Sequence, residues 1–427
     1  MIPKSNYDVV VIGAGPAGIL AAGKCSSMGL SVALLEKMEK PARKLRITGK
    51  GRCNITNTKG YNDFFGAIKP NPRFLKKAFG EFFNVDIIRL LEENGLKTVE
   101  ERGQRVFPAS GKAWDVAETL IKWAKKQKVD IFPFCEATSL LIENKAITGV
   151  EIFIKNNSKP IKISAKAVIV ATGGKSYPAT GSTGDGYKFA QQAGHSIVDL
   201  RPSLTGLETS PTFLTCKGLT LRNTQVSIGI GEKTIASDFG ELELTEHGLS
   251  GPTILKLSLQ AIDSFISGQH VTIRIDLKPA LSEQKLEARI QRDISKPGYT
   301  SVNDLLKGLL PMALAKELVK TIGVNPKMHA AQLKAGERKT LVKLLKQLEF
   351  KMTGYRSWPE AIVTAGGISL SEIESQTMMS KLCSGLFFAG EVIDLSGNTG
   401  GYNLQIAFST GWLAGKSAGE YILNAKE

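Results

Sequence analysis

The feature that most constrains the fold is a glycine-rich turn near the start of the chain. Residues 13–18 read GAGPAG and follow an apolar, β-branched run at 7–12, which is typical of a strand buried in a parallel sheet. Gly13 permits the tight turn, Gly15 lets the backbone approach a pyrophosphate, and Gly18 allows the strand and the following helix to pack closely. A helix that starts here also offers free N–H groups to an anion. The turn therefore predicts a dinucleotide-binding site.

The residues after this turn complete a strand–helix–strand unit. Pro16 and Ala17 open the helix, and a second apolar run at 31–36 ends in Glu36, 23 residues after Gly13. A carboxylate at that place accepts hydrogen bonds from an adenosine ribose and disfavours the 2′-phosphate of NADP. The unit predicts a Rossmann-like domain.

Two further glycine-rich segments lie far along the chain, each after an apolar run. Their glycines let the backbone approach a ligand at the carboxyl edge of the sheet, and the last one opens a predicted helix whose N–H groups would face a flavin pyrimidine edge. A simple NAD dehydrogenase does not need these segments, so we predict an FAD domain built from both chain ends. The residues concerned are Ala171, Thr172, Gly173, Gly174, Gly390, Glu391, Gly400, Gly401, Asn403 and Leu404.

The pattern of the sequence changes between the two halves of this domain. Residues 1–194 have α/β character, 195–280 alternate like short strands, 281–350 have helical apolar spacing, and α/β character returns at 351–427. We therefore predict an α/β protein in which a β-rich domain and a small helical domain are inserted into the FAD domain. The predicted helices include 74–93, 114–126, 282–293, 301–320, 328–349, 404–421 and one that begins near Pro252 with Ser250 as its N-cap.

The charge of the chain is strongly basic. The sequence has 55 Lys and Arg against 40 Asp and Glu, a net charge of +15. Eight Lys and Arg and a single acidic residue fall within 37–59, and the 281–350 region is also basic. Such an excess fits a polyanionic partner such as RNA, although solubility and binding of the FAD phosphates explain it equally well.

The cysteines and the apolar runs exclude several classes of protein. The five cysteines are scattered and form no CxxC pair, which argues against a disulfide framework, a zinc site and a dithiol reductase, and favours a reducing cytoplasm. No apolar run reaches the roughly 20 residues needed to span a bilayer. We therefore expect neither a metal nor a membrane partner.

With these motifs in place, the chain resembles the BaiN/YhiN-type flavoproteins of the glutathione-reductase-like FAD superfamily, over nearly its whole length. The resemblance rests on KLRITGKGRCNITN at 44–57, whose GRCN-x-TN part is quite specific. It also rests on RVFP at 105–108, HGLSGP at 247–252 and TAGGI at 364–368.

The resemblance implies tightly bound FAD and three parts: an FAD domain, a β-barrel-like domain and a helical domain. It also implies that 44–57 lies beside the flavin, although the family usually carries Ser at the position of Thr48 and Gly at that of Lys50. Arg46 and Lys50 are expected to face the approaching substrate. The FAD contacts expected from this region come from Lys37, Lys44, Thr48, Gly49, Gly51, Arg52, Cys53 and Asn54.

Three functions remain open at this point. The first is FAD-dependent reduction of a uridine in large-subunit ribosomal RNA, which the basic segment favours. The second is oxidation or reduction of a small amine or enone-type metabolite. The third is a non-catalytic flavin-bound RNA-binding factor.

Reduction of a uridine needs a hydride and a proton, so a general acid is required. Cys53 and His247 are the candidates, with loop-fixing and helix-capping roles as the alternatives. A cationic loop is expected to lower the pKa of Cys53, which would make it a poorer acid. No second GxGxxG follows a strand, so NAD(P)H, as a reductant of the flavin, is expected to bind transiently.

Overall fold

The computed structural model describes residues 2–155, 159–295 and 301–425. It divides into two compact units, Met1–Pro202 with Ile362–Glu427, and Ser203–Ala361. The first unit is thus assembled from both ends of the chain. The observed boundaries, after Pro202 and after Ala361, lie eight and eleven residues beyond the predicted ones at 194 and 350.

A seven-stranded sheet forms the centre of the first unit, in the order β7-β2-β1-β10-β9-β8, with β19 beside β10. β7, β2, β1, β10 and β19 run parallel, and the β8–β9 hairpin is antiparallel. The strands are β1 (Asn6–Ile12), β2 (Val32–Leu35), β7 (Asp130–Phe132), β8 (Cys135–Glu143), β9 (Ala146–Ile154), β10 (Ile161–Val170) and β19 (Leu386–Phe388).

Strand β10 takes part in both antiparallel and parallel pairing. Its first half, from Ile161 to Ser164, pairs with β9, whereas Val168 to Val170 pairs with β19 from the C-terminal segment. The C-terminal segment therefore completes the parallel sheet that the N-terminal segment begins. Its carboxyl edge is the place where open α/β sheets bind their ligands.

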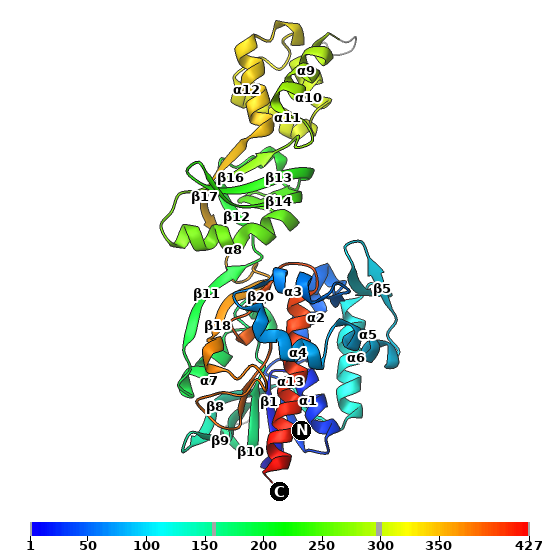
Figure 1. The fold of residues 1–427 in the computed structure, drawn as a ribbon, viewed down its shortest axis with the longest axis vertical. Helices are drawn as coiled ribbons and strands as arrows, with labels where there is room; N and C mark the ends of the chain where they lie inside the picture. Colours follow the sequence, from blue (N-terminus) through cyan, green and yellow to red (C-terminus); the bar gives the residue numbers. More distant parts are fainter. Residues whose placement is uncertain (1, 156–158, 296–300, 426–427) are drawn as a thin grey trace. The chain divides into compact units, whose positions relative to one another are not determined.

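The first and last long helices of this unit pack closely, as Figure 1 shows for α1 and α13. A Cβ on Gly411 would lie 2.3 Å from the Ala17 carbonyl oxygen, and one on Gly415 would lie 2.4 Å from that of Ala21. Only glycine permits this approach. The helices are α1 (Pro16–Ser27), α2 (Arg43–Ile47), α3 (Tyr61–Ala67), α4 (Lys76–Glu81), α5 (Asn84–Glu93), α6 (Ala113–Lys126), α7 (Asp185–Gln192) and α13 (Tyr402–Asn424).

Smaller sheets complete the first unit and support its loops. They pair β3 with β6 and β6 with β5, β11 with β18, and β4 with β20. Their bounds are β3 (Thr56–Asn57), β4 (Ile68–Lys69), β5 (Thr98–Glu101), β6 (Arg105–Pro108), β11 (Ile197–Ser203), β18 (Val363–Ile368) and β20 (Ser396–Gly397).

The second unit contains a closed barrel in the order β12-β15-β14-β13-β16-β17. Four helices, α9 to α12, follow β16 and precede β17, so they are inserted between two neighbouring barrel strands. The elements are β12 (Leu207–Ser210), β13 (Thr220–Ile230), β14 (Lys233–Leu244), β15 (Gly248–Ser250), α8 (Pro252–Ile266), β16 (Val271–Asp276), α9 (Glu283–Ile294), α10 (Val302–Lys307), α11 (Met312–Ile322), α12 (Ala335–Lys346) and β17 (Leu348–Tyr355).

Barrel and helices share one hydrophobic core. Ile273 of the barrel and Leu318 of α11 belong to the same buried cluster. The β-rich and helical parts, which the sequence separated at residue 280, therefore form one compact unit. The predicted α/β class with a Rossmann-like domain is confirmed.

Several predicted helices differ from the structure. The 74–93 helix is interrupted at Phe82 and Phe83, between α4 and α5. The 301–320 helix breaks into α10 and α11 at Pro311, which cannot continue a helix. The N-cap before Pro252 is Gly251, not Ser250, and no side chain caps it.

The helix predicted at 328–349 also extends too far toward its C-terminal end. The last helix of this region ends at Lys346, and 348–355 form a barrel strand. Residues along this strand are alternately buried and exposed, from Leu348 to Met352, as expected for period-two packing.

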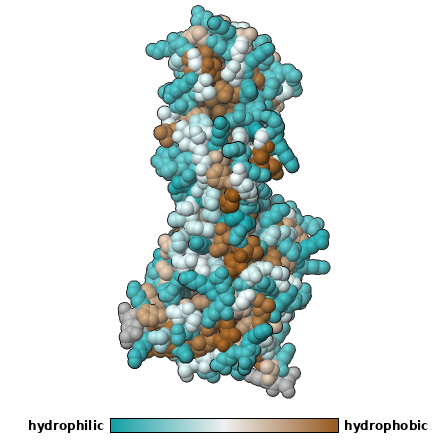
Figure 2. Space-filling model, turned by 90° about the vertical axis from the view of Figure 1, so that its left-hand side faces the viewer, coloured by the Kyte–Doolittle hydropathy of each residue, from teal (hydrophilic) through white to brown (hydrophobic). Residues whose placement is uncertain are grey.

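On the face shown in Figure 2, hydrophilic side chains surround separate hydrophobic patches. No helix within the described residues is long and apolar enough to cross a membrane. Within the same residues, no group of three or more His, Cys, Asp and Glu is placed to hold a metal ion.

Candidate flavin site

The three glycines of the first turn have different environments. A Cβ on Gly13 would lie 2.6 Å from the Ala171 carbonyl oxygen, and one on Gly18 would lie 1.9 Å from that of Gly13. No atom lies within 4 Å of the Cβ position of Gly15, which is also the uncapped N-terminus of α1. Two glycines are thus required for packing, and the third leaves open space at a helix N-terminus. This arrangement fits a pyrophosphate.

Glu36 lies at the end of β2, beside the same turn. Its Oε2 accepts a hydrogen bond from Ala14 N at 3.2 Å, and its Oε1 accepts one from Met38 N at 2.9 Å. Burial raises the pKa of this carboxyl, and the two backbone hydrogen bonds oppose the shift. Each oxygen keeps a further lone pair, so a ribose hydroxyl can still donate to it.

A buried ion pair connects three distant segments of the first unit. Lys44 Nζ lies 2.6 Å from both Glu391 Oε2 and Ser176 Oγ. Glu391 Oε1 accepts hydrogen bonds from Ser176 Oγ at 2.9 Å and from Thr364 N at 2.8 Å. Burial acts to raise the pKa of Glu391, but Lys44 and these donors together hold it below its usual value. The network joins the segments after β2, β10 and β19 to the start of β18.

Ser176 and Thr364 were not predicted as site residues. Thr364 Oγ1 accepts hydrogen bonds from the backbone N–H groups of Lys175 and Ser176, at 2.8 and 3.1 Å. A Cβ on Gly174 would lie 2.4 Å from the same oxygen, which explains the glycine. Thr364 belongs to the TAGGI segment at 364–368. The sequence showed this motif but did not show that Thr364 accepts these hydrogen bonds.

The loop of 48–54 has an unusual backbone. Gly49, Lys50 and Gly51 follow one another with φ of 58°, 56° and 85°, and Cys53 has φ of 58°. A left-handed conformation costs a non-glycine residue about 1 kcal/mol or more. A glycine at position 50 would adopt this conformation without strain, whereas Lys50 is strained there.

The end of this loop contacts the start of the last helix. The Asn54 amide, oriented with its nitrogen toward Thr56 O and its oxygen toward Gly401 N, makes hydrogen bonds of 3.0 and 3.1 Å. A Cβ on Gly401 would lie 2.5 Å from the Thr56 carbonyl carbon. Asn57 Nδ2 donates to Gly400 O at 3.3 Å. The structure thus brings the GRCN-x-TN segment into contact with residues 397–403, which read GNTGGYN.

The remaining C-terminal residues shape the same loop. Asn403 Oδ1 accepts a hydrogen bond from Gly397 N at 2.8 Å, and its Nδ2 donates to Gly397 O at 2.7 Å. Gly390 has φ of 79°, and its N–H donates to Thr410 Oγ1 at 2.9 Å. Leu404 follows in α13 and is partly buried.

Cys53 differs from the expectation. Its side chain is fully buried, and burial raises the pKa of the thiol to about 12, with a small opposing effect of the Thr48 hydroxyl. The expectation that the cationic loop lowers this pKa is wrong, because desolvation dominates over distant, solvated charges. The thiol is therefore protonated and has no access to solvent in this structure.

His247 lies in the second unit, in the turn between β14 and β15. Its side chain is half exposed, and its Nε2 lies 3.5 Å from Glu246 Oε1. Cys53 and His247 therefore belong to different units, and a joint catalytic role has no support in the structure.

Most cations of the basic segment 37–59 have acidic partners. Of its eight Lys and Arg, six form ion pairs, which are Lys37–Asp185, Arg43–Glu39, Lys44–Glu391, Arg46–Glu118, Arg52–Glu101 and Lys59–Asp63. Lys40 and Lys50 have no acidic partner in the part of the chain that the structure describes. The sequence suggested a broad positively charged surface at 37–59, but only Lys40 and Lys50 of this segment have no acidic partner among the described residues.

Arg46 and Lys50, the expected substrate-facing residues, are placed differently. Arg46 is only 10% exposed, and its guanidinium lies 3.9 Å from the Trp114 ring centroid. Its position does not support contact with an approaching substrate. Arg52, expected at the cofactor, stacks over Phe107 at 4.5 Å. Lys50 is exposed, as are its neighbours Gly49, Gly51 and Arg52.

The fold and the site together define an FAD-dependent oxidoreductase with a Rossmann-type cofactor domain. The chain belongs to the family described as "HI0933-like protein Rossmann domain", which it matches over residues 7–417. The predicted membership of the BaiN/YhiN-type flavoproteins is confirmed, and so is the expectation of an enzyme. The third alternative, a non-catalytic flavin-bound RNA-binding factor, does not agree with this result.

Two curated relatives align over almost their full length. The chain is 29% identical over 414 residues to the "3-dehydro-bile acid delta(4,6)-reductase" of Clostridium scindens, covering 96% of this chain and 98% of the relative. It is 30% identical over 420 residues to the "Ribosomal RNA dihydrouridine synthase" of Escherichia coli, covering 95% and 96%.

Among solved structures, Mycobacterium smegmatis Sdh1 in complex with UQ1 matches with a TM-score of 0.52 and 18% identity, covering 99% of this chain and 70% of that one. At this identity the match shows the shared fold alone.

Proposed function

We propose that this enzyme reduces a uridine of large-subunit ribosomal RNA to dihydrouridine with reduced FAD. The observation that carries the RNA assignment is the exposed Lys50. It has no acidic partner in the described residues, and it lies in the loop whose end contacts the start of α13. Phosphate groups are the ligands that such an unpaired surface cation attracts. The name of the Escherichia coli relative supports the same substrate.

The chain's residues divide the work of binding the cofactor. The turn of 13–18 would receive the pyrophosphate, Glu36 would accept from the ribose, and the glycine-rich segment before α13 would lie at the pyrimidine edge of the flavin. Asn54 accepts a hydrogen bond from Gly401 N at 3.1 Å and so fixes the backbone of this segment. Rigid positioning of this kind is what brings reacting atoms to about 3–3.5 Å of each other.

The reaction requires a base that has left its stack and a source of one proton. When bound, reduced FAD supplies a hydride from N5, and the uracil C5–C6 double bond takes this hydride and one proton to become a single bond. The Cys53 thiol is fully buried, so the source of this proton stays a prediction, with His247 as the candidate to be tested. NAD(P)H is the proposed transient donor that returns two electrons to the flavin, in the cytoplasm.

A second candidate is reduction of an enone-type small molecule. It is favoured by the pairing of six cations in 37–59, which leaves little positive surface for RNA. The name of the Clostridium scindens relative points in the same direction.

The first test is the dihydrouridine content of large-subunit ribosomal RNA from a strain that lacks this gene. We expect one dihydrouridine to be lost in the deletion strain and to return with the wild-type gene. A gene carrying Gly15→Val, which we expect to make protein without FAD, serves as the control and should not restore it. Unchanged dihydrouridine in the deletion strain rejects the RNA substrate and leaves the small-molecule reaction.

A further inference from the structure

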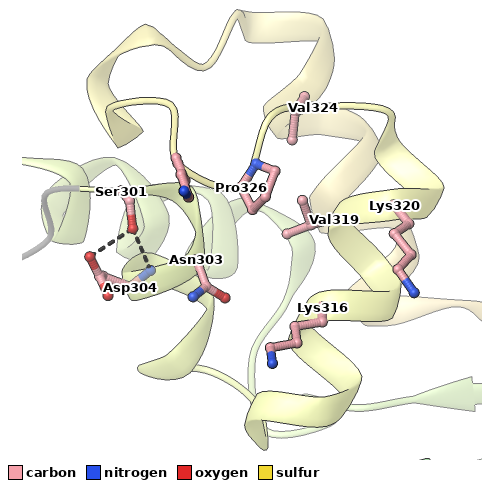
Figure 3. A pocket seen from close by; sticks show the side chains of 9 residues that line it. Ser301, Asn303, Asp304, Lys316, Val319, Lys320, Val324 and Pro326 are labelled. Atoms are coloured by element: carbon pink, nitrogen blue, oxygen red, sulfur yellow. Dashed lines mark hydrogen bonds between the residues drawn. The ribbon is translucent and has the colours of Figure 1, made fainter. Parts of the chain in front are cut away.

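A cavity of about 500 Å³ lies in the second unit, among its inserted helices. Figure 3 shows its lining residues on α10, α11 and the turn that follows α11, among them Asn303, Lys316 and Val319. Val324, Pro326 and Lys327 also line the cavity. None of these residues belongs to the flavin site, which the other unit builds.

The rim of the cavity is positively charged. Lys316, Lys320 and Lys327 line it. Lys320 pairs with Glu317 at 2.9 Å, whereas Lys316 and Lys327 are exposed and have no acidic partner in the described part of the chain.

The one acidic residue of the wall is already engaged. Asp304 accepts hydrogen bonds from Ser301 Oγ at 2.7 Å and from Lys307 Nζ at 3.0 Å. Its charge is thus compensated from within the helix, and the two unpaired lysines remain to attract an anion.

The inner wall combines apolar surface with one unsatisfied amide oxygen. Val319 is buried, and Val324 and Pro326 add further apolar atoms. The Asn303 amide adds a polar group to the same wall, but its Oδ1 is itself buried and finds no hydrogen-bond donor among the described residues.

We propose that this cavity binds one nucleotide of an RNA strand. The base lies against Val319, Val324 and Pro326, and the adjoining phosphate lies at Lys316 and Lys327. A volume of about 500 Å³ is in the range of small-molecule sites and suits a single nucleotide. The proposal rests on the proposed function, since it supplies a second RNA contact outside the flavin site.

The test compares two charge-reversed variants of the flavin-loaded full-length protein. Lys316→Glu with Lys327→Glu changes the cavity rim. Lys339→Glu with Lys343→Glu makes the same change of charge on α12, where both lysines are exposed and outside the cavity. Binding of an RNA hairpin from the large-subunit ribosomal RNA is measured against salt concentration, and each variant gene is also tested for restoring dihydrouridine.

We expect the cavity variant to bind the hairpin about tenfold more weakly or worse at low salt, with a shallower dependence on salt, while the α12 variant changes little. Flavin content should be equal in both. Competition with uridine monophosphate and with inorganic phosphate separates recognition of a nucleotide from recognition of a bare anion, and displacement by phosphate alone at equal concentration rejects the base pocket.

The outcomes distinguish this proposal from the proposed function. Equal RNA binding by the two charge-reversed variants overturns the cavity proposal, even where the wild-type gene restores dihydrouridine. Failure of the wild-type gene to restore dihydrouridine overturns the proposed function. In that case a specific loss of hairpin binding in the cavity variant still supports the cavity as an RNA site.

Discussion

Lys44 Nζ and Glu391 Oε2 lie 2.6 Å apart, although 347 positions separate the two residues in the sequence. The pair fastens the segment after β2 to the segment after β19, and each side chain is about one-fifth exposed, at 21% and 20%. The cofactor domain is therefore closed by an ion pair between its N-terminal and C-terminal contributions.

We expect Lys44→Met to destabilise the protein by about 2 kcal/mol or more, because it leaves the Glu391 carboxylate without its cation in a mostly buried position. Lys44→Met with Glu391→Gln should recover part of the loss. Denaturant unfolding of both variants and of Glu391→Gln gives the coupling between the two residues. Lys59→Met, which removes the more exposed Lys59–Asp63 pair, is the control and should cost little. A Lys44→Met protein as stable as the Lys59→Met protein would contradict a stabilising role of the Lys44–Glu391 pair.

The same pair predicts a dependence of stability on pH. The folded-state pKa of Glu391 is depressed, so its contribution is present above the unfolded value of about 4.3 and is lost as pH falls through the lower folded value. In Lys44→Met burial acts on Glu391 without the lysine and leaves its pKa higher, so the stability difference between wild type and this variant should shrink as pH falls from that higher value through the lower wild-type value. A difference that stays constant down to pH 3 would show that the pair is not the cause.

We expect Gly15→Val to fold but to lose its FAD. No atom lies within 4 Å of the Gly15 Cβ position, so the side chain occupies only the space proposed for the pyrophosphate. Gly18→Val, whose Cβ would lie 1.9 Å from Gly13 O, should instead lose the fold as well. Flavin absorbance and thermal unfolding of the two variants check this, and a yellow Gly15→Val protein contradicts the site assignment.

Lys50→Gly should raise stability and lower RNA affinity at the same time. Glycine relieves the left-handed backbone at this position, which is worth about 1 kcal/mol, and removes the exposed charge. Lys50→Asn is the control, since Asn tolerates this conformation without a charge and should lower RNA affinity equally. Arg52→Ala should act mainly on stability, because Arg52 is held by Glu101. Melting curves and hairpin binding at two salt concentrations separate these effects.

His247→Gln should lower the turnover of the bound substrate while FAD content and substrate affinity remain unchanged. Removal of a general acid costs typically 10²–10⁴-fold, so a loss of at least about 100-fold is expected. Single-turnover oxidation of the reduced flavin by substrate measures it, and Glu246→Gln is the neighbouring control. A His247→Gln enzyme with wild-type turnover would require another proton source.

Much of the framework was predicted from the sequence because it depends on local spacing. The turn of 13–18, the position of Glu36 and the apolar strands around them predict one strand–helix–strand unit without any tertiary information. The last helix was likewise predicted, at 404–421 against the observed Tyr402–Asn424, because glycines and helical periodicity are local signals.

The tertiary structure alone decided which charges remain free and which groups are buried. The sequence shows eight cations in 37–59, but their partners Asp185, Glu391 and Glu118 lie far along the chain and are found only by folding. The same holds for Cys53, whose pKa is set by burial rather than by the neighbouring lysines and arginines. Local order determined the cofactor turn, whereas long-range packing determined the electrostatics of the site, because charge and desolvation depend on neighbours in space and not on neighbours in sequence.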